Sequence, residues 1–103
     1  MSYPTCSLIA TTYNWPEALE LVLLSIVNQT ILPNEVIIAD DGSREDTKEL
    51  IEIFQKVFPI PLIHVWHEDK GFRLATIRNK AISKAKYHYI LQNLRRAKRN
   101  PSY

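Results

Sequence analysis

Three short polar segments carry side chains that could bind a charged ligand bearing hydroxyl groups. Residues 11–14 (TTYN) offer hydroxyls, an amide and an aromatic ring. Asp40 and Asp41 supply carboxylates, which accept hydrogen bonds from a base N–H or from ribose hydroxyls and can assist a metal ion. Arg73 and Arg78 lie five apart, and each guanidinium can grip phosphate oxygens in bidentate fashion. Together the three segments predict a site for a nucleoside diphosphate.

Each segment also has a purely structural interpretation, and these alternatives stay open. Tyr13 could pack beside a capped helix start, and the sequence DDGS at 40–43 is good turn chemistry without a ligand. The two arginines could form surface salt bridges with Glu68 or Asp69. A glycine-rich dinucleotide or phosphate loop is excluded, because the chain contains only Gly42 and Gly71.

The segments lie between alternating strand and helix patterns. Short apolar runs predict strands at residues 5–11, 36–39, 62–67 and 87–92. Apolar residues at helical spacing predict helices at 16–29, 44–58 and 74–85. Asn14 or Trp15 is expected to cap the first helix, and Ser43 with Asp46 resembles a capping box for the second.

The fold class predicted from this alternation is α/β, a Rossmann-like open parallel sheet in the order β-α-β-α-β-α-β. Short connections favour right-handed crossovers with helices on both faces of the sheet. Ligands of such sheets bind at the carboxyl ends of the strands, near the point where the strand order reverses. The three polar segments each follow a strand, so we expect them to meet at that edge.

Composition indicates one soluble domain. The 103 residues are 46% hydrophobic and 23% charged, with a formal net charge of +2. Residues 93–103 hold four of the 13 basic residues and no acid, so the remainder has 9 basic against 11 acidic residues. A slightly acidic body argues against a specific nucleic-acid partner, although a basic tail that binds nucleic acid remains an alternative.

Cysteine and histidine usage point away from redox or metal chemistry. The single Cys6 excludes a disulfide framework and is expected to be buried and inert. His64, His67 and His88 lack metal-ligand spacing and are expected to be satisfied structural histidines. No signal peptide and no apolar run of roughly 20 residues are seen, so a cytoplasmic location is expected. Peripheral membrane association and homodimerisation are further open hypotheses.

Longer stretches carry a family resemblance. The segments LIATTYNWPEALELVLLSIVNQT and VIIADDGSREDT resemble the nucleotide-sugar half of family 2 glycosyltransferases, which have the GT-A fold. The segment HEDKGFRLATIRNKAISKAKYHYILQ is similar to bacterial polysaccharide and chondroitin-type polymerising transferases. The resemblance covers about Cys6 to Gln92. It implies that residues 1–92 are a nucleotide-sugar-binding subdomain, the N-terminal half of a GT-A fold.

The resemblance implies roles for the residues at the first two strand ends. Thr11 and Tyr13 match the turn whose hydroxyl and ring contact the base. Asp41 matches the acid that accepts a hydrogen bond from uracil, while Asp40 supports the site or is structural. The implied nucleotide is therefore UDP.

The third segment and the reaction follow from the same resemblance. Arg73 matches a basic residue near the donor diphosphate, and Arg78, in the RN pair, is either structural or diphosphate-facing. The implied reaction is inverting transfer of a hexosyl or N-acetylhexosaminyl group from a UDP-sugar donor to a glycan acceptor. A divalent cation, Mn²⁺ or Mg²⁺, is implied for the full-length family, where it screens the leaving diphosphate.

The sequence departs from the family after Gln92. Where the family continues to an Asp-x-Asp metal motif and an acceptor-binding half, this chain has NLRR at 93–96 and a basic segment to residue 103. We therefore expect no catalytic residue and no metal site here, and a truncation, frameshift or fragment boundary near Gln92. The chain is expected to be inactive alone. The alternative is a non-catalytic nucleotide-binding or interaction module.

Overall fold

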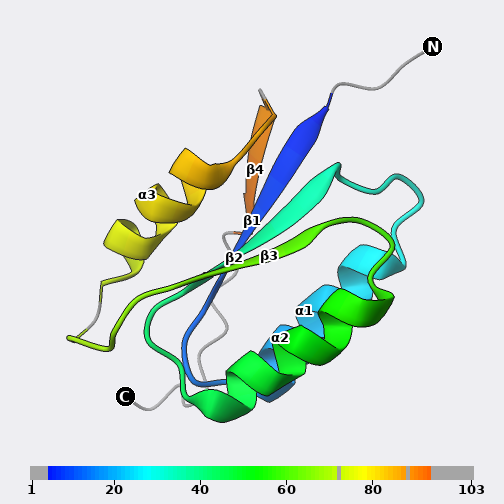
Figure 1. Ribbon diagram of the computed structural model, residues 1–103. Helices are drawn as coiled ribbons and strands as arrows, with labels where there is room; N and C mark the ends of the chain where they lie inside the picture. The colour runs from blue at the N-terminus through cyan, green and yellow to red at the C-terminus, as the bar shows by residue number, and fades with distance from the viewer. Residues whose placement is uncertain (1–4, 72, 88, 94–103) are drawn as a thin grey trace.

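Strands and helices alternate along the whole described chain (Figure 1). The computed structural model describes residues 5–71, 73–87 and 89–93. Its elements are β1 (Cys6–Thr12), α1 (Pro16–Val27), β2 (Glu35–Asp40), α2 (Glu45–Val57), β3 (Leu62–Trp66), α3 (Leu74–Lys84) and β4 (Tyr89–Asn93). All the predicted elements are present, and the observed ends lie within about two residues of the predicted ones, an ordinary uncertainty for helix and strand termini.

The strands form one parallel sheet in the order β3-β2-β1-β4. The chain steps from β1 to β2 to β3 in one direction, and then returns to place β4 on the other side of β1. Right-handed crossovers therefore put α1 and α2 on one face and α3 on the other (Figure 1). The predicted Rossmann-like α/β fold is confirmed, and the strand order reverses between β1 and β4.

Two apolar clusters hold these layers together. On one face, α1 and α2 bury Leu19, Leu23, Ile26 and Ile51 against β2. On the other face, α3 packs Ile77 and Ala81 against β1 and β2. All six residues of β2 are buried, as the uninterrupted apolar run predicted for a strand covered on both sides.

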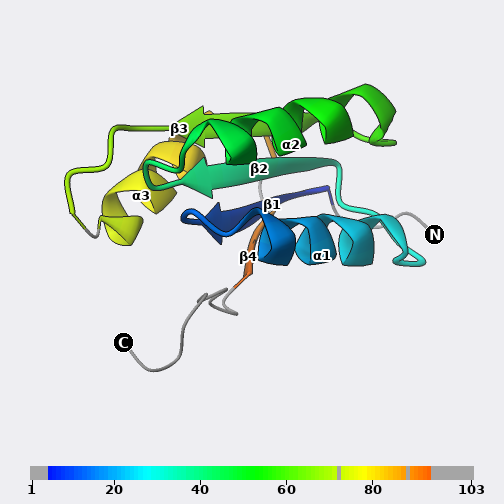
Figure 2. The ribbon, with the colours of Figure 1, turned by 90° about the horizontal axis from the view of Figure 1, so that it is seen from below.

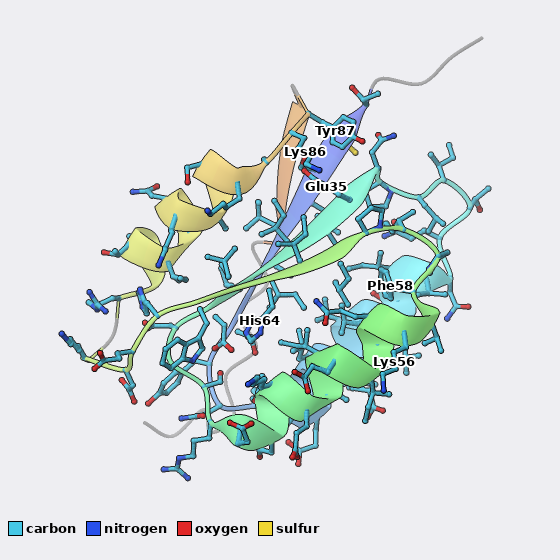
Figure 3. The ribbon with its side chains drawn as sticks, in the orientation of Figure 1. Glu35, Lys56, Phe58, His64, Lys86 and Tyr87 are labelled. Carbon is cyan, nitrogen blue, oxygen red and sulfur yellow. The ribbon has the colours of Figure 1, made fainter. Side chains whose placement is uncertain are left out.

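A buried carboxylate fastens the amino-terminal end of the sheet. Glu35 is 1% exposed, and its Oε2 accepts hydrogen bonds from the Ser7 hydroxyl at 2.7 Å and from the Lys86 backbone N–H at 2.8 Å. Figure 3 shows Glu35 and Lys86 side by side at this end. These bonds join β2 to β1 and to the segment before β4. Nearby Cys6 is half-buried rather than buried, and it is a free cysteine.

The carboxyl edge of the sheet, opposite Glu35, is where polar residues follow the strands. Figure 2 shows the arrowheads of β1 and β2 pointing to the same side, from which the connections to the helices leave. Residues 13–14 follow β1, residues 41–43 follow β2, and residues 67–71 with Arg73 follow β3 at this edge. In the described part of the chain, no helix is long and apolar enough to cross a membrane.

We expect Leu23→Ala to lower the free energy of unfolding by about 2–5 kcal/mol, because it leaves a cavity between α1 and the sheet. Leu21 on the same helix is 69% exposed, whereas Leu23 is fully buried, so Leu21→Ala is a matched control expected to cost less than about 0.5 kcal/mol. Urea denaturation followed by circular dichroism measures both. Equal losses in the two variants would contradict the observed packing of α1.

Candidate functional site

The turn after β2 carries two buried carboxylates whose oxygens all have partners. Asp40 is 1% exposed; its Oδ1 accepts from the Ser43 N–H at 2.9 Å, and its Oδ2 lies 2.7 Å from His64 Nε2. The first bond is an Asx-type turn that shapes the chain after β2. Asp40 is therefore bound within the protein on both oxygens, which agrees with its expected supporting role.

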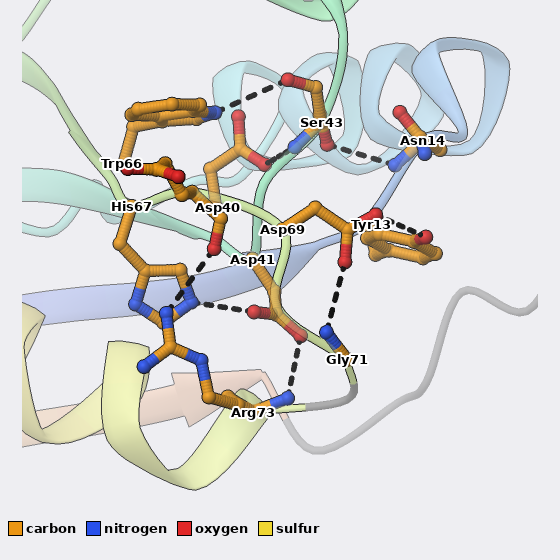
Figure 4. A network of polar contacts seen from close by, with 11 residues as sticks. Tyr13, Asn14, Asp40, Asp41, Ser43, Trp66, His67, Asp69, Gly71 and Arg73 are labelled. Atoms are coloured by element: carbon orange, nitrogen blue, oxygen red, sulfur yellow. Dashed lines mark hydrogen bonds and ion pairs between the residues drawn. The ribbon is translucent and has the colours of Figure 1, made fainter.

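Asp41 joins this turn to the segment after β3 (Figure 4). The side chain is fully buried, with Oδ1 at 2.5 Å from His67 Nε2 and Oδ2 accepting from the Arg73 backbone N–H at 2.8 Å. Its own N–H donates to the Thr12 carbonyl at 3.1 Å. The carboxylate thus binds two residues of the segment after β3, while the backbone N–H of Asp41 binds the end of β1.

The strand register explains why these residues meet. Thr12 pairs with Asp40 between β1 and β2, and Asp40 pairs with Trp66 between β2 and β3. One residue further along each strand come Tyr13, Asp41 and His67, which therefore follow neighbouring strand ends at matching positions. The parallel register places an aromatic ring, a carboxylate and an imidazole at one edge.

Gly42 permits the segment after β3 to cross over the turn after β2. Its φ is +82°, and a Cβ at this position would lie 2.5 Å from the Asp69 backbone. Such a distance is far inside van der Waals contact, so only glycine fits here. Asp69 in turn accepts a hydrogen bond from the Tyr13 hydroxyl at 2.9 Å through its Oδ2. The segment at residues 67–71 is thereby fixed to the ends of β1 and β2.

Trp15 is the N-cap residue of α1, as one of the two predicted alternatives had it, but the predicted capping box of Ser43 and Asp46 is wrong. The Asn14 N–H donates to Ser43 Oγ at 2.8 Å, and Asn14 Oδ1 accepts from the Arg44 N–H at 2.8 Å. Helix α1 begins after Trp15 and α2 after Arg44, each without a side-chain cap bond. Asp46, expected in a capping box with Ser43, accepts from the next residue's N–H. The Asn14 and Ser43 side chains, which the local pattern assigned to capping, accept hydrogen bonds from residues 30 and 29 positions away instead.

The two arginines differ in their surroundings. Arg73 donates from Nη2 to the Glu68 carbonyl at 3.1 Å, while its Nε is buried without a hydrogen-bond partner. Arg73 therefore binds the backbone carbonyl of Glu68 and not its carboxylate, which was one of the structural alternatives. Arg78 is half-buried within α3 and takes no part in the network of Figure 4. The structure brings Arg73, and not Arg78, to Asp41.

At the end of β1, Thr11 is half-buried, whereas its neighbour Thr12 is 4% exposed. The Thr12 hydroxyl is buried without a hydrogen-bond partner. The sequence prediction named Thr11, whose role in binding stays a prediction, and did not single out Thr12. The only signal in the sequence was the pair of adjacent threonines, which does not tell which hydroxyl is buried.

Sequence reasoning also missed the partnership of the histidines with the acids. His64 and His67 are satisfied, as expected, but by the two carboxylates that were assigned to the site. His88 lies outside the described residues. Among residues 5–71, 73–87 and 89–93, no group of three or more His, Cys, Asp or Glu side chains is placed to hold a metal ion.

Gly42→Ala should destabilise the fold more than Gly71→Ala. Both glycines have positive φ, at +82° and +89°, but a Cβ at Gly71 meets nothing within 4 Å. Gly71→Ala therefore costs only backbone strain of about 1 kcal/mol, whereas Gly42→Ala also displaces the Asp69 backbone. Chemical denaturation of both variants measures the difference. A Gly42→Ala variant as stable as Gly71→Ala would show that residues 67–71 do not pack on this turn.

The Tyr13–Asp69 bond has a titration signature. The hydrogen bond to the Asp69 carboxylate raises the pKa of Tyr13 above its ordinary value of 10.0. A raised folded-state pKa means that the contribution to stability is complete below about pH 10 and is lost as pH rises through the folded-state pKa of Tyr13. Asp69→Asn should bring this pKa back toward 10, measured by NMR of ¹³Cζ-labelled tyrosine. An unchanged Tyr13 titration in that variant would contradict the contact.

Comparison with known proteins identifies the family of this chain. The sequence profile described as Glycosyl transferase family 2 matches residues 7–92. The chain is 38% identical over 85 residues to a chondroitin synthase of Escherichia coli, which covers 82% of this chain and 12% of that protein. It is 40% identical over 85 residues to a hyaluronan synthase of Pasteurella multocida, covering 82% and 8%.

A relative with a different printed activity shows the same match. The chain is 33% identical over 78 residues to a validoxylamine A glucosyltransferase of Streptomyces hygroscopicus subsp. limoneus, covering 74% of this chain and 17% of that protein. The match thus spans only 8% to 17% of the length of these relatives. With a family profile that matches most of its residues and a sheet of the expected order, the chain belongs to glycosyl transferase family 2.

Proposed function

We propose that this chain forms the donor-binding part of an inverting glycosyltransferase that transfers a sugar from a UDP-sugar to a hydroxyl of a glycan in polysaccharide or cell-surface glycan synthesis. The observation that carries the proposal is the cluster of Tyr13, Asp41 and Arg73 at the carboxyl edge of the sheet. The family membership supports the reaction class, and the names of the relatives that make chondroitin and hyaluronan support a polysaccharide product.

Each member of the cluster has a group suited to one part of the donor. The Tyr13 ring is 41% exposed and offers a face on which a base can stack. Asp41 already accepts one bond on each oxygen, and a carboxylate oxygen can accept a second, here from the uracil N–H. One guanidinium nitrogen of Arg73, Nη2, binds the Glu68 carbonyl, and the group has further N–H donors that suit a diphosphate oxygen. In this proposal Thr11 borders the base, and Arg78 supports α3.

Access to Asp41 requires a local shift. The carboxylate is fully buried, and the segment at residues 67–71 lies against Gly42 and bonds Tyr13 through Asp69. The uracil edge therefore reaches Asp41 when this segment moves away from the turn after β2. The Tyr13–Asp69 bond is exposed and weak, so breaking it costs little.

The described residues do not fit the divalent cation that the resemblance implies. Asp40 and Asp41 are each bonded to a histidine, and no other cluster of acids or histidines gathers in the described part of the chain. We propose that the ligands of Mn²⁺ or Mg²⁺, the general base and the acceptor contacts come from other residues than these. The role of this chain is then to bind and orient the donor.

The remaining expectations stay predictions. A non-catalytic nucleotide-binding module would bind UDP but would take no part in sugar transfer, so an assay of UDP release distinguishes it from a donor-binding part of an active enzyme. The alternative of a nucleic-acid-binding tail depends on residues 94–103, which lie outside the described residues, whereas Asn93 is the last residue of β4. A cytoplasmic location, peripheral membrane association and homodimerisation are likewise proposals without a structural test here.

UDP should bind the chain more tightly than CDP, because cytosine has no N3–H to donate to Asp41. Arg73→Gln should weaken UDP binding about tenfold and leave uridine binding unchanged, since uridine has no diphosphate. Lys70→Gln, an exposed cation in the same segment, is the matched control. Isothermal titration calorimetry with UDP, CDP and uridine measures these differences.

Several outcomes would contradict parts of the proposal. Absence of UDP binding would contradict donor binding, and equal affinities for UDP and CDP would contradict the role of Asp41. Assay of UDP release from UDP-glucuronate and UDP-N-acetylhexosamines, with Mn²⁺ present, separates the catalytic alternatives. UDP binding without release would favour the non-catalytic module for this chain.

A further inference from the structure

A hollow of about 270 Å³ opens between the end of β3 and the first turn of α2. Its lining comes from the turn after β2, from α2 and from one face of β3: Ser43, Arg44, Glu45, Lys48, His64 and Trp66. None of the residues assigned to the donor lines it. The hollow is therefore a second place on the molecule where a ligand could bind.

Trp66 gives the hollow a fixed aromatic wall. Its Nε1–H donates to the Ser43 carbonyl at 3.1 Å, which holds the indole in place (Figure 4). The side chain nevertheless remains 46% exposed. Because its polar group is already bonded, the indole offers a ligand only its apolar face. A large aromatic side chain held rigidly in an exposed position is typical of a binding surface.

His64 precedes Trp66 on β3 and forms part of the same wall of the hollow. His64 and Trp66 are two residues apart, so they point to the same face of β3, toward α2. The imidazole is anchored by its bond of 2.7 Å to Asp40, and its side chain is 17% exposed. Figure 3 shows His64 between β3 and α2. This wall is thus fastened to the interior of the protein at two points.

The opposite wall carries positive charge. Arg44 immediately precedes α2 and Lys48 lies in its first turn, and both residues line the hollow. Lys48 is 3.8 Å from Glu45, an exposed pair whose attraction is weak. Within residues 5–71, 73–87 and 89–93, Arg44 forms no ion pair. Two cations against one acid favour an anionic ligand.

We propose that the hollow binds one acidic sugar ring of a glycan chain, with the apolar face of the ring on Trp66 and its carboxylate at Arg44 and Lys48. The choice of a saccharide rests on the proposed function, because a transferase that extends a glycan meets such chains. The volume is just below the usual range for small-molecule pockets, so it holds a single ring rather than several.

A single-stranded nucleic acid suits the hollow less well. Such ligands bind along grooves where several aromatic side chains stack successive bases and where the charge is uniformly positive. Here one indole faces the ligand, and Glu45 stands in the rim. A neutral saccharide would leave Arg44 and Lys48 without a partner, so the acidic sugar fits the charge of the site better.

The test is a titration of the whole chain with a hyaluronan hexasaccharide, which contains glucuronate, followed by the Trp66 indole resonance in ¹⁵N NMR spectra. We expect a saturable shift of Trp66 and none of Trp15. The double variant Arg44→Gln/Lys48→Gln should weaken binding at least tenfold. Lys56→Gln, also on α2 but nearer its carboxyl end, is the matched control and should bind like the unmodified chain (Figure 3).

Comparison ligands make the proposal falsifiable. The same hexasaccharide with its carboxyl groups reduced should bind at least tenfold more weakly; equal binding would overturn the assignment to an acidic sugar. Tighter binding of a thymidine hexanucleotide at Trp66 would overturn the assignment to a saccharide. Absence of any saturable shift with hyaluronan would overturn the site itself.

Two further measurements separate this proposal from folding defects and from donor binding. Trp66→Leu should abolish binding of the hexasaccharide, while Trp66→Phe keeps an aromatic face and should retain most of it, which shows that the fold survives. UDP affinity should be unchanged in Arg44→Gln/Lys48→Gln. Hexasaccharide binding without UDP binding would contradict donor binding alone, and UDP binding without the hexasaccharide would contradict this inference alone.

Discussion

The hydrogen bonds of the buried Asp41 carboxylate are the interaction on which the carboxyl edge of this sheet depends. A carboxylate removed from water is costly unless its oxygens accept hydrogen bonds, and here His67 and the Arg73 backbone supply them. In meeting that requirement, the chain is drawn from the end of β3 back across the turn after β2. The crossing needs Gly42 beneath it, and it brings Asp69 to Tyr13. The positions of the remaining site residues follow from this one requirement.

In this arrangement, the hydrogen bonds that stabilise the folded chain compete with those that the proposed ligand would form. In the ligand-free chain, the groups that suit a nucleotide bind one another, which fixes their positions before the ligand arrives. A ligand must then replace some of these internal bonds, so its affinity is the difference between the bonds gained and the bonds lost. The Arg73 Nε and the Thr12 hydroxyl have no hydrogen-bond partner among the described residues, but both are buried, so a ligand would reach them only after the surrounding chain shifts.

The sequence predicted the layers of this fold well, because apolar periodicity reports burial directly. The run VIIA predicted a doubly covered strand, and Leu19, Leu23 and Ile26 are buried at the helical spacing that predicted α1. The edge that holds the site was also predictable, since parallel strands direct the segments after them to one side. The structure brings Tyr13, Asp41 and Arg73 to this edge, as predicted, and their role in binding stays a proposal.

The local turn of Asp40 and Ser43 was predictable from the sequence DDGS, but most other polar contacts of the site were not, since they join residues far apart in the sequence. Ser43 was assigned to a local capping box, yet its hydroxyl accepts from Asn14, 29 residues away. Asp41 and His67 are 26 residues apart, and only the parallel register brings them together. The burial of Asp41 has the same origin, because a segment that follows a different strand covers it. Local patterns report local bonds, and this site is made of distant ones.

The strand order has a consequence for synthesis of the chain. β1 lies between β2 and β4, with Cys6 paired to Tyr89 and Ala10 paired to Asn93. As the chain emerges from the ribosome, β2 and β3 can assemble on β1 early, but the other edge of β1 stays open until residues 89–93 emerge. During that interval the nascent sheet exposes an unpaired row of backbone donors and acceptors, the kind of edge that other chains can join. When β4 is in place, β1 becomes an interior strand, and the edge of the described sheet moves from β1 to β4.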